Sequence, residues 1–105
     1  MTTVWAAVPQ RRERAIVVTG HATGSEKVCA AVSGILYALA GYLSNAKGVD
    51  IQTMRMEDAH VCLKWTGGKK DLAALQMACI GLMQIEKAHP DFIKTEISEK
   101  IFEKS

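Results

Sequence analysis

The chain has 105 residues, of which 49% are hydrophobic and 23% are charged, and its formal net charge at pH 7 is +2. This composition is ordinary for one globular domain over residues 1–105 and argues against a disordered chain. The small net charge gives no reason to expect direct nucleic-acid binding. Three cysteines without paired spacing argue against a disulfide framework, and the first residues lack signal-peptide features, so we expect a reducing, cytoplasmic location.

The N-terminal part of the chain predicts two paired strands. Residues 3–8 are mostly apolar and end at Pro9, and the β-branched segment 14–20 ends at Gly20. Between them, the charged group at residues 11–14 predicts a solvated turn, because a short basic run interrupted by an acid is usually exposed.

A long helix is expected over residues 26–45, with Glu26 at the positive end of its dipole. No charge interrupts residues 28–46, a length close to that needed to span a bilayer. The segment also contains Gly, Ser and Asn, and a small domain without it would lose most of its core, so we predict a buried helix and no membrane contact. Its broad apolar surface predicts cover by a sheet and by a second subunit, as in a homodimer.

The rest of the chain predicts two further strands, a second helix and a last strand. They are expected at residues 49–57, 59–65, 71–89 and 92–102. Val61, Leu63 and Trp65 fall on one strand face, and Pro90 stops the helix. The resulting order ββαββαβ predicts an α+β fold, a two-layer sandwich with two helices on one face of a mainly antiparallel sheet.

One cysteine is placed for thiol chemistry. Cys29 lies near the start of the long helix, where unpaired N–H groups and the helix dipole favour a thiolate. His21 precedes it in the loop and could accept its proton, while Glu26 could orient the imidazole or cap the helix. Backbone N–H groups near Cys29 would hold an oxyanion. Spacing alone leaves a second interpretation open, an inert packed thiol, which is the commoner case for a helical cysteine.

The other candidate residues are weaker. His60 and Cys62 share one strand face, but two side chains do not make a metal site, and no metal is predicted. Cys79 falls on the apolar stripe of the second helix and is expected in the core. His89 is expected to act as a cation at that helix's C-terminus. The methionines are expected to fill the core or an interface.

The loop and the start of the long helix carry two short motifs. The first is Gly20-His21-Ala22, followed by Gly24, and the second is Val28-Cys29-Ala30-Ala31-Val32-Ser33. Together they resemble the motifs of the ribosomal-processing cysteine protease family, Prp. The resemblance extends over the whole chain in length and element order, and it includes the helix end at residues 87–92.

The resemblance implies a cysteine endopeptidase with Cys29 as the nucleophile and His21 as the general base and acid. The supporting residues it implies are Gly20, Gly24, Glu26 and Ser33. It also implies a small cytoplasmic homodimer that uses no cofactor. The implied substrate is a peptide segment, either the N-terminal extension of a ribosomal large-subunit protein of the protein 27 type or part of a phage structural protein.

The chain departs from the family pattern between base and nucleophile. The loop from His21 to Cys29 is a few residues shorter, Glu26 replaces an aspartate, and Lys27 replaces an apolar residue. These changes keep a second hypothesis open: a non-catalytic dimeric binding module that retains the fold with a shortened active-site loop.

Overall fold

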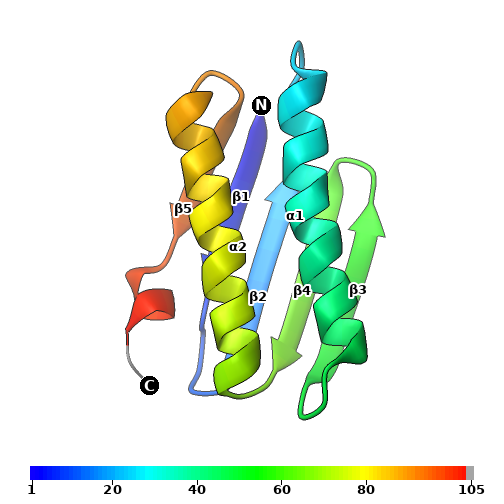
Figure 1. The fold of residues 1–105 in the computed structure, drawn as a ribbon, viewed down its shortest axis with the longest axis vertical. Coiled ribbons are helices and arrows are strands. Elements are labelled where there is room, and N and C mark those ends of the chain that lie inside the picture. The colour runs from blue at the N-terminus through cyan, green and yellow to red at the C-terminus, as the bar shows by residue number, and fades with distance from the viewer. Residues whose placement is uncertain (104–105) are drawn as a thin grey trace.

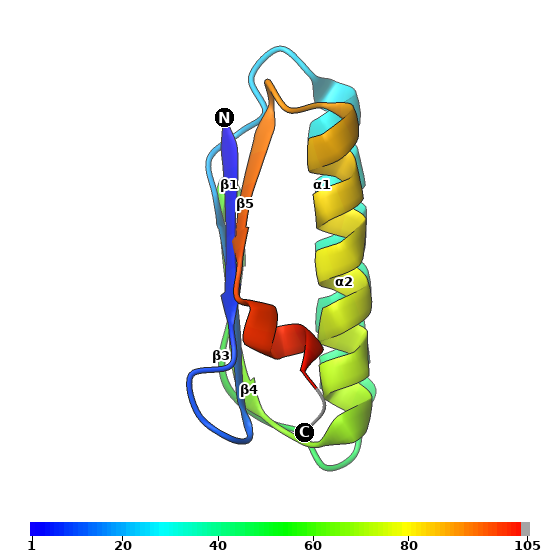
Figure 2. The same cartoon turned by 90° about the vertical axis from the view of Figure 1, so that its left-hand side faces the viewer.

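The computed structural model describes residues 1–103, which form a five-stranded sheet with two long helices across one face (Figure 1, Figure 2). The elements are β1 (Thr2–Ala7), β2 (Glu13–Thr19), α1 (Glu26–Asn45), β3 (Asp50–Glu57), β4 (His60–Thr66), α2 (Lys69–Ala88), β5 (Ile93–Ile97) and the 3₁₀ helix η1 (Glu99–Phe102). The predicted ββαββαβ order and two-layer α+β class are confirmed.

The C-terminal segment differs from the prediction of one strand over residues 92–102. The strand ends at Ile97, and the chain then turns into η1, which lies between the sheet and α2 in Figure 2. Ile101 is fully buried there, and its carbonyl accepts a hydrogen bond from Gln76 Nε2 at 2.7 Å. Burial of this apolar side chain against α2 explains why the strand does not continue.

The strand pairing brings two distant segments together. The sheet order is β3-β4-β2-β1-β5, and all neighbouring strands are antiparallel except β1 and β5. Thr19 at the end of β2 lies opposite His60 at the start of β4, which in turn lies opposite Glu57 at the end of β3. The loop after β2 therefore starts beside the tight β3–β4 turn.

The core lies between the sheet and the helices. Leu63 and Trp65 are buried and Val61 packs against them, as the strand alternation predicted. Cys79 on α2 is also fully buried, in agreement with the prediction. Two methionines lie outside the core, so only the interface part of their prediction is left for them; the first is Met77, which is 73% exposed. The second is Met54, which is 38% exposed.

Helix α1 buries only one side. Its inward stripe packs against the sheet and consists of Val28, Val32, Leu36, Leu39, Ala40 and Leu43. By length and composition alone α1 is one helix that could cross a membrane, but here it packs as a core helix. Its outer side is uncovered, with Tyr37 67% exposed and Tyr42 38% exposed.

Residues 11–14 were predicted to form a solvated turn, and this prediction is wrong for Arg14. Arg14 is only 5% exposed, and its guanidinium Nε donates to Asp71 Oδ2 at 3.2 Å. It also donates to the carbonyls of Gly68 and Arg11. A buried arginine needs such partners, and the nearest carboxylate comes from the first turn of α2.

Candidate active site

The thiol of Cys29 is placed by the capping of α1. Ser25 is the N-cap, and its hydroxyl accepts a hydrogen bond from the Val28 N–H at 3.2 Å. Cys29 follows at the end of the first turn, where its side chain is half-buried. Its thiol donates to the Ala22 carbonyl at 3.8 Å. The sulfur therefore faces the loop that carries His21.

The expected oxyanion donors near Cys29 are already engaged. The Val28 N–H donates to the Ser25 hydroxyl, and the Cys29 N–H donates to the Ser25 carbonyl at 3.2 Å. In this conformation these two groups are therefore not free to hold an oxyanion, and their predicted role stays a prediction. The N–H groups of Glu26 and Lys27 lie in the first turn of α1 and have no intrahelical acceptor. They are therefore the donors that remain available at this helix end.

Gly20 fixes the backbone that carries His21. Its φ is +83°, and its N–H donates to the Ala59 carbonyl at 2.9 Å. A Cβ at this position would collide with the Met1 carbonyl oxygen, so both conformation and space require glycine. Gly24 has a φ of +92° in the same loop. The two supporting glycines of the sequence motif thus have a conformational role here.

His21 meets a carboxylate that the sequence did not single out. Its Nε2 lies 3.7 Å from Asp58 Oδ2, with the side chains 52% and 94% exposed. The neighbouring Glu57 is engaged elsewhere, since its carboxylate accepts a hydrogen bond from Arg55 Nε at 2.8 Å. That hydrogen bond lowers the pKa of Glu57 below its usual value. Only strand pairing relates Asp58 to His21, and no local motif signals it.

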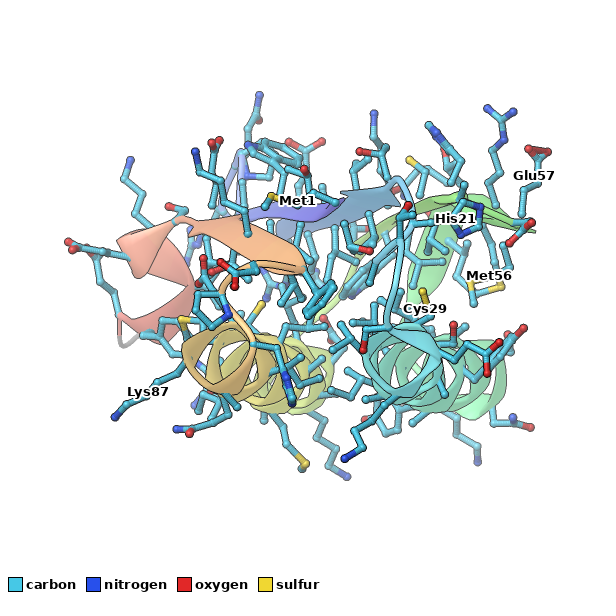
Figure 3. The ribbon with its side chains drawn as sticks, turned by 90° about the horizontal axis from the view of Figure 1, so that it is seen from above. Met1, His21, Cys29, Met56, Glu57 and Lys87 are labelled. Carbon is cyan, nitrogen blue, oxygen red and sulfur yellow. The ribbon has the colours of Figure 1, made fainter. Side chains whose placement is uncertain are left out.

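A cavity of about 230 Å³ lies between α1 and the β3–β4 hairpin, and both His21 and Cys29 line it. Figure 3 shows Cys29 on the sheet side of α1, with Met56 pointing toward the same space and Glu57 away from it. The lining also includes the apolar and aromatic residues Val18, Val32, Leu36, Tyr37 and Val61 and the polar residues Thr2, Ser33, Glu57, Asp58 and His60. The base and thiol predicted from the motif thus open onto one groove, which polar and apolar residues line together.

The remaining predicted residues divide between the groove and its margin. Ser33 lines the groove one helical turn after Cys29. Glu26 lies in the first turn of α1 and borders a second hollow that includes His21 and Cys29. Within residues 1–103 its carboxylate forms no hydrogen bond or ion pair, so it does not orient the imidazole in this structure.

Of the other cysteines and histidines, His60 also lines the groove, whereas Cys62, Cys79 and His89 do not. Burial raises the pKa of the Cys79 thiol to about 12, which keeps it protonated and inert. Cys62 lies opposite Arg55 on β3 and is half-buried. His89 is the C-cap of α2, where it was expected. Across residues 1–103, no three His, Cys, Asp or Glu side chains are grouped as metal ligands.

Comparison with known proteins identifies the family. The family model described as cysteine protease Prp matches residues 1–94. The ribosomal processing protease Prp from S. aureus, in a crystal structure with a covalently linked product peptide, has a TM-score of 0.76 and 20% identity, over 93% of this chain and 100% of that chain. The same protease with a substrate peptide has a TM-score of 0.71 and 18% identity, with the same coverage.

A third structure, SMU.848 from Streptococcus mutans, has a TM-score of 0.69 and 23% identity, over 92% of this chain and 93% of that chain. No curated protein sequence matches this chain. At these identities the structures show a shared fold, whereas the family model covers most of the chain. The resemblance inferred from the motifs is confirmed, and the chain belongs to the cysteine protease Prp family and is a cysteine protease.

Proposed function

We propose that this protein is an endopeptidase with a Cys29–His21 dyad that removes an N-terminal extension from a ribosomal large-subunit protein of the protein 27 type, or cuts a phage structural protein. The observation that carries the proposal is the groove between α1 and the β3–β4 hairpin, which both dyad residues line. Structures of S. aureus Prp with substrate and product peptides support a peptide as ligand for this fold.

The proposed reaction begins with proton transfer from the Cys29 thiol to His21. The thiolate attacks the peptide carbonyl carbon, and the carbonyl oxygen becomes an oxyanion beside the helix N-terminus. His21 returns the proton to the leaving amine as the C–N bond breaks, and water then hydrolyses the thioester. The thiol donates to the Ala22 carbonyl in the free protein. This hydrogen bond must break before the thiol can give its proton to His21.

The groove sets the class of peptide that fits. Its lining includes aliphatic side chains of three elements, Val18 on β2, Leu36 on α1 and Val61 on β4, together with polar residues such as His60. Tyr37 borders it and is 67% exposed. An extended peptide that lies along this groove would contact Tyr37 and Val61, which supports an unfolded terminal extension as substrate.

The protein is proposed to be a cytoplasmic homodimer. Its three cysteines are free, which suits a reducing compartment. The outer sides of the two helices leave an apolar hollow uncovered, lined by Ile35, Ala38, Tyr42, Ala74 and Met77. Light scattering after size exclusion tests the dimer, and a monomer at micromolar concentration would contradict it.

The hydrogen bond from the thiol to Ala22 and the short loop are the features that a non-catalytic binding module would explain, so the experiment includes that outcome. Wild type, C29A and C62A are incubated with peptides spanning ribosomal and phage N-terminal extensions, and products are identified by mass spectrometry. Cleavage by wild type and C62A but not by C29A is expected, since Cys62 is also half-buried but lies outside the groove. Binding without cleavage in all three proteins would instead support the module.

A further inference from the structure

The β3–β4 turn presents one carboxylate to the His21 ring. Asp58 Oδ2 lies 3.7 Å from His21 Nε2, and within residues 1–103 no other acidic side chain comes within ion-pair distance of this imidazole. We propose that Asp58 is a positioning residue, which holds the imidazole proton on Nε2 and leaves Nδ1 to accept the Cys29 proton. This inference rests on the proposed role of His21 as the base.

The backbone, not the Asp58 side chain, sets this approach. The Gly20 N–H donates to the Ala59 carbonyl at 2.9 Å, which ties the residue before His21 to the residue after Asp58. Ala59 has a φ of +59°, so the hairpin reverses in a tight turn at this point. Thr19 and His60 are paired directly below. Asp58 is therefore held next to His21 although its side chain is 94% exposed.

Two other carboxylates lie near the loop, but neither contacts His21. Glu57 forms an ion pair with Arg55, with 2.7 Å between Oε2 and Nη2, and Figure 3 shows it pointing away from the groove. Glu26, at the start of α1, makes no ion pair with His21 within the described residues. Of these three carboxylates, Asp58 is therefore the one that faces His21.

The chemistry follows from the two imidazole nitrogens. A neutral imidazole carries one proton, and a carboxylate beside Nε2 favours the tautomer that is protonated there. The lone pair on Nδ1 can then accept the Cys29 proton, and Asp58 stabilises the resulting imidazolium. A separation of 3.7 Å exceeds a hydrogen bond, and such contacts shorten when substrate excludes water. The other ionisable groups around His21 are Glu26, Glu57 and His60.

The test measures the reactivity of Cys29 with iodoacetamide near pH 6, followed by mass spectrometry, so that no natural substrate is needed. D58N is expected to lower the rate by about twofold to fivefold, because an exposed ion pair contributes little. D58E is expected to restore it. E57Q removes the same charge from the adjacent residue and is expected to react like wild type. Ring ¹⁵N shifts of His21 are expected to show the Nε2–H tautomer in wild type and a loss of that preference in D58N.

The outcomes separate this inference from the proposed function. A wild-type rate and an unchanged tautomer in D58N, with a slow rate in H21A, overturn the positioning role and leave the dyad intact. An H21A protein that reacts as fast as wild type overturns the dyad itself. An equal loss in E57Q and D58N also contradicts the inference, because it would reflect general charge near the loop rather than the Asp58 contact.

Discussion

Arg14 and Asp71 form a buried ion pair that joins the start of β2 to the start of α2. Arg14 Nε lies 3.2 Å from Asp71 Oδ2, and the side chains are 5% and 4% exposed. The same carboxylate accepts hydrogen bonds from Trp65 Nε1 at 2.9 Å and from the Gly68 N–H at the N-cap of α2. One side chain therefore holds together a strand, a neighbouring strand and a helix start.

Replacement of Asp71 by Asn is expected to lower the free energy of unfolding by about 3 to 5 kcal/mol, because the Arg14 charge remains buried without a counter-charge. Urea unfolding followed by circular dichroism measures the change. E57Q removes one charge of the exposed Arg55–Glu57 pair and is expected to change the free energy of unfolding far less, because solvent screens this pair. Equal losses in the two variants would contradict the structural role assigned to the buried pair.

Much of the fold follows from local pattern. The helix predicted over residues 26–45 begins and ends as observed, because Ser25 caps it and its apolar stripe has helical period. The strand alternation placed Val61, Leu63 and Trp65 on the core face. Arg14 was misjudged because its partner is 57 residues away in sequence, and no local rule relates a charge to such a partner.

The site is predictable in part for the same reason. The motif named His21 and Cys29 because both lie within one short stretch, and the structure opens them onto one groove. Asp58 was missed because the pairing of β2 with β4 brings it to His21. For the predicted oxyanion donors, helix position alone does not show that Ser25 accepts the hydrogen bonds of the Val28 and Cys29 N–H groups in the free protein.

Substitution of Gly20 by Ala is expected to destabilise the protein much more than substitution of Gly48 by Ala. Both glycines have positive φ, +83° and +78°, and a left-handed alanine costs about 1 to 2 kcal/mol at either position. Only at Gly20 would the added Cβ also meet a backbone atom, the Met1 carbonyl oxygen. Thermal unfolding of both variants measures the difference, and similar melting temperatures would contradict it.

The buried Cys79 thiol is expected to make stability fall as pH rises above about 9. Burial raises its pKa from 9.0 to about 12, so between these values the unfolded chain loses the proton while the folded chain keeps it. The loss is about 1.4 kcal/mol per pH unit in this window. In urea titrations at pH 8, 9 and 10, the difference in the free energy of unfolding between wild type and C79A should become smaller as the pH rises. L82A, a neighbouring truncation without a titrating group, should show a constant difference.

Removal of the Ser25 hydroxyl is expected to affect both stability and the thiol. S25A leaves the Val28 N–H without its cap, which costs about 1 kcal/mol, and it loosens the turn that places Cys29. Cys29 alkylation by iodoacetamide near pH 6 should therefore slow. S98A is the control. It removes the Ser98 hydroxyl that caps η1 and accepts a hydrogen bond from the Lys100 N–H at 3.3 Å, far along the chain from the groove. An equal decrease of the Cys29 alkylation rate in both variants would show that general destabilisation, and not the position of Cys29, controls the reactivity of the thiol.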